Sequence, residues 1–203
     1  VERSRGLGDV YKRQDLTAPL ARFTAKNFDN LPRPFKRYQL GTVWRNEKPG
    51  PGRFREFLQF DADYVGTSNL LADSELCVLI SEILEKCGLA NNEFNIKISN
   101  RKLSKGLLEE LNIIDQNKQS ISLRAIDKLD RVGIEGVRLL LGKGRKDKSG
   151  DFTDGAQLEE KQIKKILEFL NTKDLSQLEQ IKCKNKLFEE GINELKKIVK
   201  NFF

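Results

Sequence analysis

Hydrophobic and polar residues alternate along residues 53–64, as expected for a β-strand with two unlike faces. Successive side chains of a strand point to opposite sides. One face therefore carries polar side chains and one aromatic side chain, namely Arg53, Arg55, Phe57, Gln59, Asp61 and Asp63. The other face carries Phe54, Leu58, Phe60, Ala62 and Tyr64. We expect this apolar face to pack against another part of the protein.

A second strand is predicted just before the first, over residues 35–45. It contains Tyr38, Val43 and Trp44, which are residue types common in sheets. Residues 46–52 between the two strands include two prolines and two glycines, which interrupt a strand and favour a turn. The pattern thus predicts an antiparallel hairpin.

Helical periodicity dominates the rest of the chain. Apolar residues recur at helical spacing in 16–26, 73–87, 101–111, 122–132, 133–141, 159–170 and 187–202. One more strand is predicted at 94–99, where apolar and polar residues alternate. The first helix has Asp15 or Thr17 as its N-terminal cap.

These elements predict an α+β protein with a partial antiparallel sheet, flanking helices and a small helical domain. We expect an arm at residues 1–14 that is non-native or unstructured, because this segment lacks any sustained apolar period. The pattern changes after residue 112, from mixed strands and helices to helices with little strand signal, and this change divides residues 15–111 from residues 112–203.

Composition and charge narrow the class of protein only slightly. The chain has 203 residues, 38% of them hydrophobic, and a net charge of +7. This charge permits RNA binding but by itself favours a solvated lysine-rich surface. Its three cysteines have no metal-binding spacing and favour a reducing, cytoplasmic setting. No stretch is long and apolar enough for a transmembrane helix.

The glycine-rich segment 142–155 invites comparison with a phosphate-binding loop. It lacks the Gly-Lys-Ser/Thr ending of that motif, and no buried strand leads into it. We interpret it as a mobile, solvated connection, in which Arg145 and Lys146 remain candidates for contact with nucleic acid.

Along the polar face of the 53–64 strand, the type of side chain changes from one end to the other. Arginines bind phosphates, an aromatic ring stacks on a planar base, and carboxylates accept an ammonium group. Arginines at one end, Phe57 in the middle and carboxylates at the other end therefore fit ATP beside an amino acid, or an aminoacyl adenylate. An ordinary half-exposed strand with solvated charges explains the pattern equally well.

Several of these residues also form a motif. RNE at 45–47 followed by RFREF at 53–57 resembles motif 2 of the class II aminoacyl-tRNA synthetases. DLT at 15–17 and QFDAD at 59–63 resemble the histidyl-tRNA synthetase family, in the form that has Asp-Leu-Thr in place of Glu-Gly-Thr. The resemblance covers about residues 15–158 and is strongest over 15–66. It implies that residues 15–111 form a partial class II catalytic core that includes motif 2, and that residues 112–203 form a helical insertion domain truncated at its C-terminal end.

The resemblance implies a role for nine side chains. It assigns ATP to Arg45, Glu47, Arg53, Arg55 and Phe57, and histidine to Asp15, Thr17, Gln59 and Asp63. Arg45 is the implied catalytic residue, because it would bind the α-phosphate and stabilise the charge that develops there. Mg²⁺ would accompany ATP as part of the substrate, with no metal site in the protein itself.

The resemblance further implies a histidine–tRNA ligase that activates histidine with ATP and transfers it to tRNA(His). A homodimer is expected for the full-length enzyme. We find no motif 1, no later motif with a second catalytic arginine, no motif 3 and no anticodon-binding domain. The chain also contains no methionine. We therefore interpret it as an internal fragment and expect it to be inactive by itself.

Two alternatives remain open. The non-catalytic regulatory subunit of ATP phosphoribosyltransferase shares the synthetase fold and binds histidine, but it would be free to lose the ATP-binding residues that are present here. A class II synthetase for another amino acid, such as proline or threonine, is less consistent with DLT at 15–17 together with Gln59 and Asp63.

Overall fold

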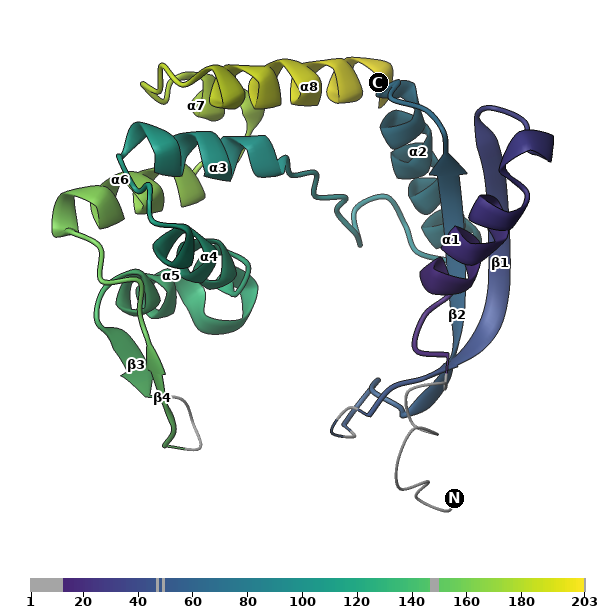
Figure 1. The fold of residues 1–203 in the computed structure, drawn as a ribbon, viewed down its shortest axis with the longest axis horizontal. Helices are drawn as coiled ribbons and strands as arrows, with labels where there is room; N and C mark the ends of the chain where they lie inside the picture. Colours follow the sequence, from purple (N-terminus) through teal and green to yellow (C-terminus); the bar gives the residue numbers. More distant parts are fainter. Residues whose placement is uncertain (1–12, 47, 49, 147–149, 203) are drawn as a thin grey trace. The chain divides into compact units, whose positions relative to one another are not determined.

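The computed structural model describes residues 13–46, 48, 50–146 and 150–202. The chain divides into two compact units, Val1–Leu76 and Cys77–Phe203. An antiparallel hairpin dominates the first unit, and helices dominate the second (Figure 1). The mixture of helices with a small antiparallel sheet is the α+β arrangement that the sequence predicts.

The first unit is built on the hairpin of β1 (Phe35–Trp44) and β2 (Glu56–Val65). The two strands pair antiparallel from Phe35↔Val65 to Trp44↔Glu56, which confirms the predicted hairpin. However, β2 begins at Glu56 and not at residue 53. Arg53 instead forms an isolated bridge with Gly50 in the connecting turn. The alternation expected for the whole 53–64 segment therefore does not extend to Arg53 and Arg55.

Two helices pack on opposite faces of the hairpin. Leu16, just before α1 (Thr17–Lys26), is fully buried, and Gly41 of β1 lies against it. On the other face, Glu75 of α2 (Leu71–Lys86) accepts hydrogen bonds from Lys36 at 2.8 Å and from Tyr64. A short 3₁₀ helix, η2 (Phe28–Asn30), links α1 to β1. The hairpin is therefore covered on each side, but only in part.

Much of the apolar face of the hairpin remains open to solvent. Leu58 is 67% exposed, and Tyr38, Leu40 and Phe60 are exposed as well. The rings of Tyr38 and Phe60 stack on each other at 6.3 Å between centroids. Only the end near Tyr64 lies under α2. The expectation that this face is packed is thus wrong for the middle of the strand, as far as the described residues extend.

Two residues of the expected N-terminal arm contact the hairpin. The backbone N–H of Trp44 donates to the carbonyl of Arg13 at 2.9 Å, and Arg13 Nε donates to the carbonyl of Thr42 at 2.9 Å. Arg45 Nε donates to the carbonyl of Gln14 at 3.0 Å. Arg13 and Gln14 are therefore ordered parts of the first unit. Residues 1–12 lie outside the described residues, and the non-native origin of the segment stays a prediction.

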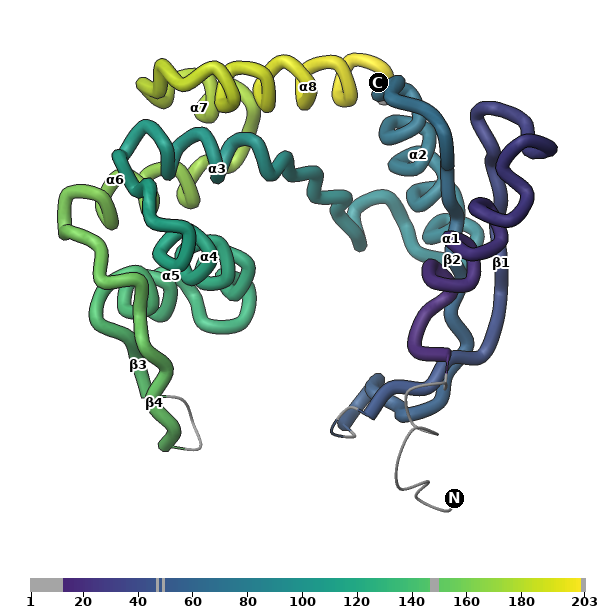
Figure 2. Tube along the Cα trace, viewed as in Figure 1, coloured from purple at the N-terminus to yellow at the C-terminus, as the bar shows by residue number. Residues whose placement is uncertain are grey.

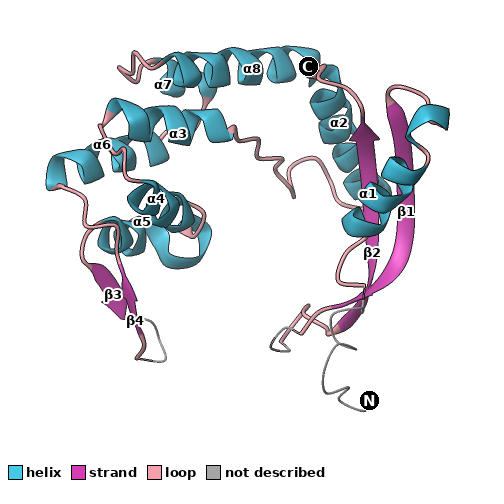
Figure 3. Ribbon diagram, viewed as in Figure 1, coloured by secondary structure: helices cyan, strands magenta, loops and turns pink. Residues whose placement is uncertain are grey.

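The second unit is mostly helical from residue 101 onward, with one short hairpin (Figure 3). Its helices are α3 (Arg101–Glu110), α4 (Gln116–Ile126), α5 (Leu129–Leu141), α6 (Glu160–Leu170), α7 (Leu175–Glu179) and α8 (Lys186–Phe202). The hairpin pairs β3 (Gly144–Lys146) with β4 (Phe152–Asp154). The hairpin was missed at the sequence level, where residues 142–155 were interpreted as a solvated connection.

One hydrophobic core holds the helices together. It includes Leu107 and Leu108 of α3, Val137 of α5, Ile166 of α6 and Phe188 of α8, all of them almost fully buried. Helix α3 therefore packs with the helical unit, although the sequence grouped it with the catalytic core of 15–111. The stability of this unit comes from burying one apolar stripe from each helix.

The strand predicted at 94–99 does not form. Residues 87–100 connect α2 to α3 without helix or strand (Figure 2). Phe94, Ile96 and Ile98 are still half-buried while their neighbours are exposed, so the alternating pattern indicated the side-chain directions correctly. A strand also needs a neighbouring strand to satisfy its backbone groups. No such neighbour pairs with these residues within the described part of the chain.

The expected boundary between two helices at residues 132 and 133 appears as a kink inside α5. Gly133 has φ +67° and ψ 177°, outside the helical region. Glycine adopts such positive φ values without the steric cost that other residues incur. The kink therefore follows from the residue type, although α5 begins earlier, at Leu129.

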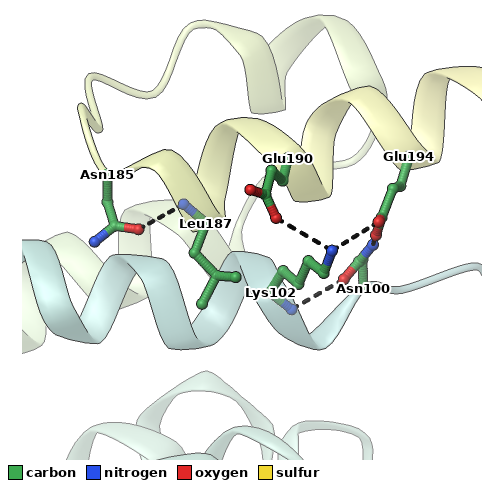
Figure 4. A network of polar contacts seen from close by, with 6 residues as sticks. All are labelled: Asn100, Lys102, Asn185, Leu187, Glu190 and Glu194. Carbon is green, nitrogen blue, oxygen red and sulfur yellow. Dashed lines mark hydrogen bonds and ion pairs between the residues drawn. The ribbon is translucent and has the colours of Figure 1, made fainter.

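A polar network ties α3 to α8 at the edge of the core (Figure 4). Lys102 Nζ lies 2.7 Å from a carboxylate oxygen of Glu194 and 3.2 Å from one of Glu190. Asn100 donates to Glu194 at 2.7 Å. The hydrogen bonds from Lys102 and Asn100 lower the pKa of the Glu194 carboxyl group. The hydrogen bonds to Glu194 and, second, to Glu190 raise the pKa of the Lys102 ammonium group.

No helix among the described residues has the length and apolar character needed to span a membrane.

Replacing Gly106 with alanine should destabilise the helical unit. A Cβ at this position of α3 would lie 2.6 Å from the backbone nitrogen of Phe188 in α8, which forces the two helices apart. We expect Gly106→Ala to lower the free energy of unfolding by about 1–3 kcal/mol in urea denaturation followed by circular dichroism. The control Lys105→Ala changes an exposed side chain of the same helix and should alter it by less than about 0.5 kcal/mol. Equal effects of the two variants would contradict the close packing.

Replacing Glu194 with glutamine should change the pH dependence of unfolding. Because the pKa of Glu194 is lowered from its ordinary 4.5 in the folded protein, its stabilising contribution is fully present above pH 4.5 and lost as the pH falls through the folded pKa. The difference in unfolding free energy between the parent and Glu194→Gln should therefore shrink below pH 4.5. Urea denaturation of both proteins at a series of pH values, from neutral to acidic, measures this difference in unfolding free energy. Glu110→Gln, at an exposed position of α3, should follow the parent throughout.

Candidate functional site

The register of the hairpin brings several predicted site residues onto one face. Residues paired directly across an antiparallel ladder point to the same side. Val43 pairs with Phe57, Gly41 with Gln59, Gln39 with Asp61 and Arg37 with Asp63. The side chains of Phe57, Gln59, Asp61 and Asp63 are half-buried, in contrast to the exposed Leu58 and Phe60 between them.

Arg45 lies at the end of this face that is next to the turn, directly after β1. Its Nη2 donates to Gln59 Oε1 at 2.8 Å, and its guanidinium carbon lies 5.1 Å from the centroid of the Phe57 ring, within the range of a cation–π contact. Gln59 Nε2 in turn donates to Asp61 Oδ1 at 2.8 Å. The structure therefore joins three of the predicted site residues, Arg45, Phe57 and Gln59, in direct contact.

Asp63 belongs to a neighbouring group of contacts on the same face. Its Oδ2 accepts a hydrogen bond from Arg37 Nε at 3.1 Å. The same arginine donates to the carbonyl of Leu16 at 3.2 Å and to the side chain of Gln39. Leu16 lies between Asp15 and Thr17, so this group links the start of α1 to β2.

The N-cap position of α1 is Leu16, between the two residues expected there. Asp15 still satisfies a backbone donor of the first turn, because its Oδ1 accepts the N–H of Ala18 at 2.9 Å. Thr17 is the first helical residue, and its side chain is exposed. The hydrogen bond to Ala18 explains Asp15 without a ligand, and a ligand-binding role for either residue stays a prediction.

Two further predicted ATP residues, Arg53 and Arg55, lie in or beside the turn between the strands. Arg53 and Arg55 are exposed, and the Arg55 carbonyl accepts the backbone N–H of Arg45 at 2.8 Å. Both side chains make interactions within the protein. Glu47 lies outside the described residues. The role of these three residues stays a prediction.

A separate open hollow of about 300 Å³ lies where β2 leads into α2. Its lining includes Asp63, Ser68, Asn69 and Asp73, but not Arg45, Phe57 or Gln59. Within the described residues there is no group of three or more histidine, cysteine, aspartate or glutamate side chains able to hold a metal ion. Phe57 lies on a strand face and Arg45 just beyond the end of β1, and neither lines this hollow.

Arg37 and Gln39 were not among the residues predicted from sequence. A signal was nevertheless present: alternation along the first strand puts both side chains on one face, and an antiparallel hairpin brings that face beside the acidic end of the second strand. The exact partner of each residue depends on the register, which the sequence alone left open.

The face presents a guanidinium beside an aromatic ring, followed along the strand by an amide and two carboxylates. A guanidinium binds a phosphate, a ring stacks on a base, and carboxylates attract an ammonium group. The arrangement is therefore suited to a nucleotide next to an amino acid.

Comparison with known proteins agrees with this chemistry. A family model described as histidyl-tRNA synthetase matches residues 10–149. A histidine–tRNA ligase of Brucella ovis is 48% identical over 200 residues, which cover 94% of this chain and 40% of that protein. One from Bartonella quintana is 54% identical over 161 residues, or 78% of this chain and 32% of that protein.

Solved structures show the same likeness. The crystal structure of histidyl-tRNA synthetase from Nostoc sp. PCC 7120 matches with a TM-score of 0.77 and 29% identity over 94% of this chain and 42% of that one. A structure from Bacillus halodurans, described as an ATP phosphoribosyltransferase regulatory subunit/histidyl-tRNA synthetase, matches with a TM-score of 0.69 at 18% identity, which indicates a shared fold only.

The fold is that of a partial class II aminoacyl-tRNA synthetase, as the sequence predicted. More specifically, the chain belongs to the histidyl-tRNA synthetase family. It spans 40% of the length of the Brucella relative.

Proposed function

We propose that the longer protein containing this chain is a histidine–tRNA ligase. The observation that carries the proposal is the contact of Arg45 with both Phe57 and Gln59 on one face of the hairpin. This arrangement puts a phosphate-binding cation between a surface for the base and a polar group for the amino acid. The family membership supports the same reaction.

The first step is the activation of histidine. A carboxylate oxygen of histidine attacks the α-phosphorus of ATP, the bond to the bridging oxygen breaks, and pyrophosphate leaves. Negative charge increases on the α-phosphate oxygens in the transition state, and Arg45 stabilises it there. Phe57 stacks on the adenine, and Glu47 accepts a hydrogen bond from its amino group. Arg53 and Arg55 lie near the nucleotide. Mg²⁺ enters with ATP and neutralises part of the phosphate charge.

Histidine is held at the acidic end of the face. Its ammonium group is attracted to Asp63 and the amide oxygen of Gln59, with Asp15 and Thr17 closing the group from the start of α1. The half-buried positions of Gln59 and Asp63 strengthen such a charge interaction relative to one in water. The structure of the free chain already orders this end through Arg37.

The second step transfers the histidyl group. A hydroxyl of the terminal ribose of tRNA(His) attacks the carbonyl of histidyl-adenylate, and AMP leaves. The helical unit follows the catalytic face in the chain, and we propose that it forms an insertion domain in the full-length protein. A homodimer and a cytoplasmic location are further parts of this proposal.

The alternative is a histidine-binding regulatory subunit of ATP phosphoribosyltransferase. The solved structure from Bacillus halodurans supports only a shared fold. Such a regulator does not need a guanidinium group next to an aromatic ring for ATP binding. In this chain the guanidinium group of Arg45 contacts the ring of Phe57. The synthetase is therefore the better proposal.

Replacing Arg45 with alanine in the full-length protein should abolish most of its activation chemistry. We expect histidine-dependent ATP–pyrophosphate exchange to fall by about 10²–10³-fold, because one donor to the developing charge is lost. Lys26→Ala, at an exposed position at the end of α1, should retain exchange within about twofold. A parent protein that binds histidine but catalyses no exchange would favour the regulatory subunit. Exchange with another amino acid in place of histidine would show that the substrate is wrong.

The 203-residue chain alone should be inactive in the same exchange assay. The expected motif with a second catalytic arginine is not in its sequence, so the stabilisation of phosphate charge is incomplete. The full-length protein, assayed in parallel, is the positive control. Histidine-dependent exchange by the isolated chain above the rate of its own Arg45→Ala variant would overturn this expectation.

A further inference from the structure

Arg37 occupies a central position between three parts of the first unit. Its Nε donates to Asp63 Oδ2 at 3.1 Å, and its Nη2 lies 3.1 Å from the same oxygen. Nη2 also donates to the carbonyl of Leu16 at 3.2 Å, and Nη1 donates to Gln39. The Arg37 side chain is only 16% exposed and that of Asp63 is 23% exposed.

The guanidinium group suits this task better than an ammonium group. It is planar and carries five N–H donors in a fixed fork, so one side chain can bind acceptors in different directions at once. Here the acceptors come from β1, from β2 and from the residue before α1. A lysine at the same position would place one compact charge and could not span all three.

The contacts leave room for a ligand at Asp63. Both contacts of Arg37 fall on Oδ2, so the pair does not use Oδ1. The pairing also offsets one of the two carboxylates, Asp61 and Asp63, that share this face. Like charges on adjacent groups repel one another, and the fixed guanidinium beside Asp63 offsets this repulsion and holds its side chain in one orientation.

We infer that Arg37 is a positioning residue for histidine: it fixes the Asp63 carboxylate and the Asp15–Thr17 segment relative to each other so that both face one amino-acid substrate. The inference rests on the proposed function. Arg37 acts through Asp63 and the Leu16 carbonyl and does not itself touch the nucleotide. Its removal therefore weakens histidine binding selectively and leaves ATP binding at Arg45 and Phe57 intact.

Lys36 provides a matched control. It is the preceding residue of β1, so its side chain points to the opposite face. It too forms an ion pair, with Glu75 of α2 at 2.8 Å, but both side chains are 54% exposed. Loss of the Lys36–Glu75 pair removes an ion pair between β1 and α2 that is about as short as the Arg37–Asp63 pair, but it leaves the polar face unchanged.

The experiment compares Arg37→Gln, Arg37→Lys and Lys36→Gln in the full-length protein. Histidine affinity is measured by calorimetry, and KM values for histidine and ATP by ATP–pyrophosphate exchange. We expect both Arg37 variants to weaken histidine binding about tenfold or more, equivalent to about 1.4 kcal/mol, with the KM for ATP changed by less than about twofold. Lys36→Gln should change neither by more than about twofold.

A double-mutant cycle separates positioning from simple stability. If Arg37 acts through Asp63, adding Asp63→Asn to Arg37→Gln should weaken histidine binding by less than about twofold more, although Asp63→Asn alone weakens it strongly. Additive effects would overturn the inference. Unchanged histidine affinity in Arg37→Lys would overturn it as well, and this charge-retaining variant decides the question if Arg37→Gln does not fold.

The outcome also distinguishes this inference from the proposed function. A parent protein that binds histidine but shows no exchange refutes the ligase, and calorimetry on the same variants still tests Arg37. An equal loss of histidine and ATP binding, together with a lower melting temperature, would mean that Arg37 only stabilises the hairpin, and the inference would be wrong.

Discussion

The antiparallel pairing of β1 with β2 is the constraint on which the first unit depends. Each backbone pair along the ladder determines which side chains meet, and Val43↔Phe57 and Arg37↔Asp63 follow from a single register. A shift by one residue would turn every side chain of one strand to the opposite face. Arg45 would then lose Gln59, and Arg37 would lose Asp63. The register therefore produces both groups of contacts on the face, the one around Arg45 and the one around Arg37.

The two faces of this hairpin are used in opposite ways. The polar face is half-buried, because the residues before α1 lie on it, whereas the apolar face is open around Leu58. Burial of polar groups is tolerated only when their hydrogen bonds are satisfied, and here Arg37 and Arg45 supply the donors. The ordering of this face thus comes from paired polar groups together with the buried side chains of Leu16 and Val43. The helical unit differs, because its stability rests on apolar packing with one polar network at the edge.

Sequence patterns predicted the regular elements well where each element satisfies its own backbone. The long hairpin and most of the amphipathic helices appear close to their expected positions. The helix expected at 122–132 is an exception, because α4 ends at Ile126 and α5 begins at Leu129. The prediction failed where a partner was needed. Residues 94–99 alternate correctly but have no neighbouring strand in the described structure, and the β3–β4 hairpin forms from residues with little apolar signal. Alternation likewise could not reveal that Arg53 and Arg55 fall in a turn.

The sequence by itself determined the family motif, the composition of the two strand faces and the nine candidate residues, since these depend on residue type and spacing alone. Tertiary structure decided which of these residues touch. It brought Arg45 onto Phe57 and Gln59, gave Arg37 its place between Asp63 and Leu16, and joined α3 to the helical core. The physical reason is that such contacts join residues distant in the chain, and a local pattern specifies the direction of a side chain but not its partner.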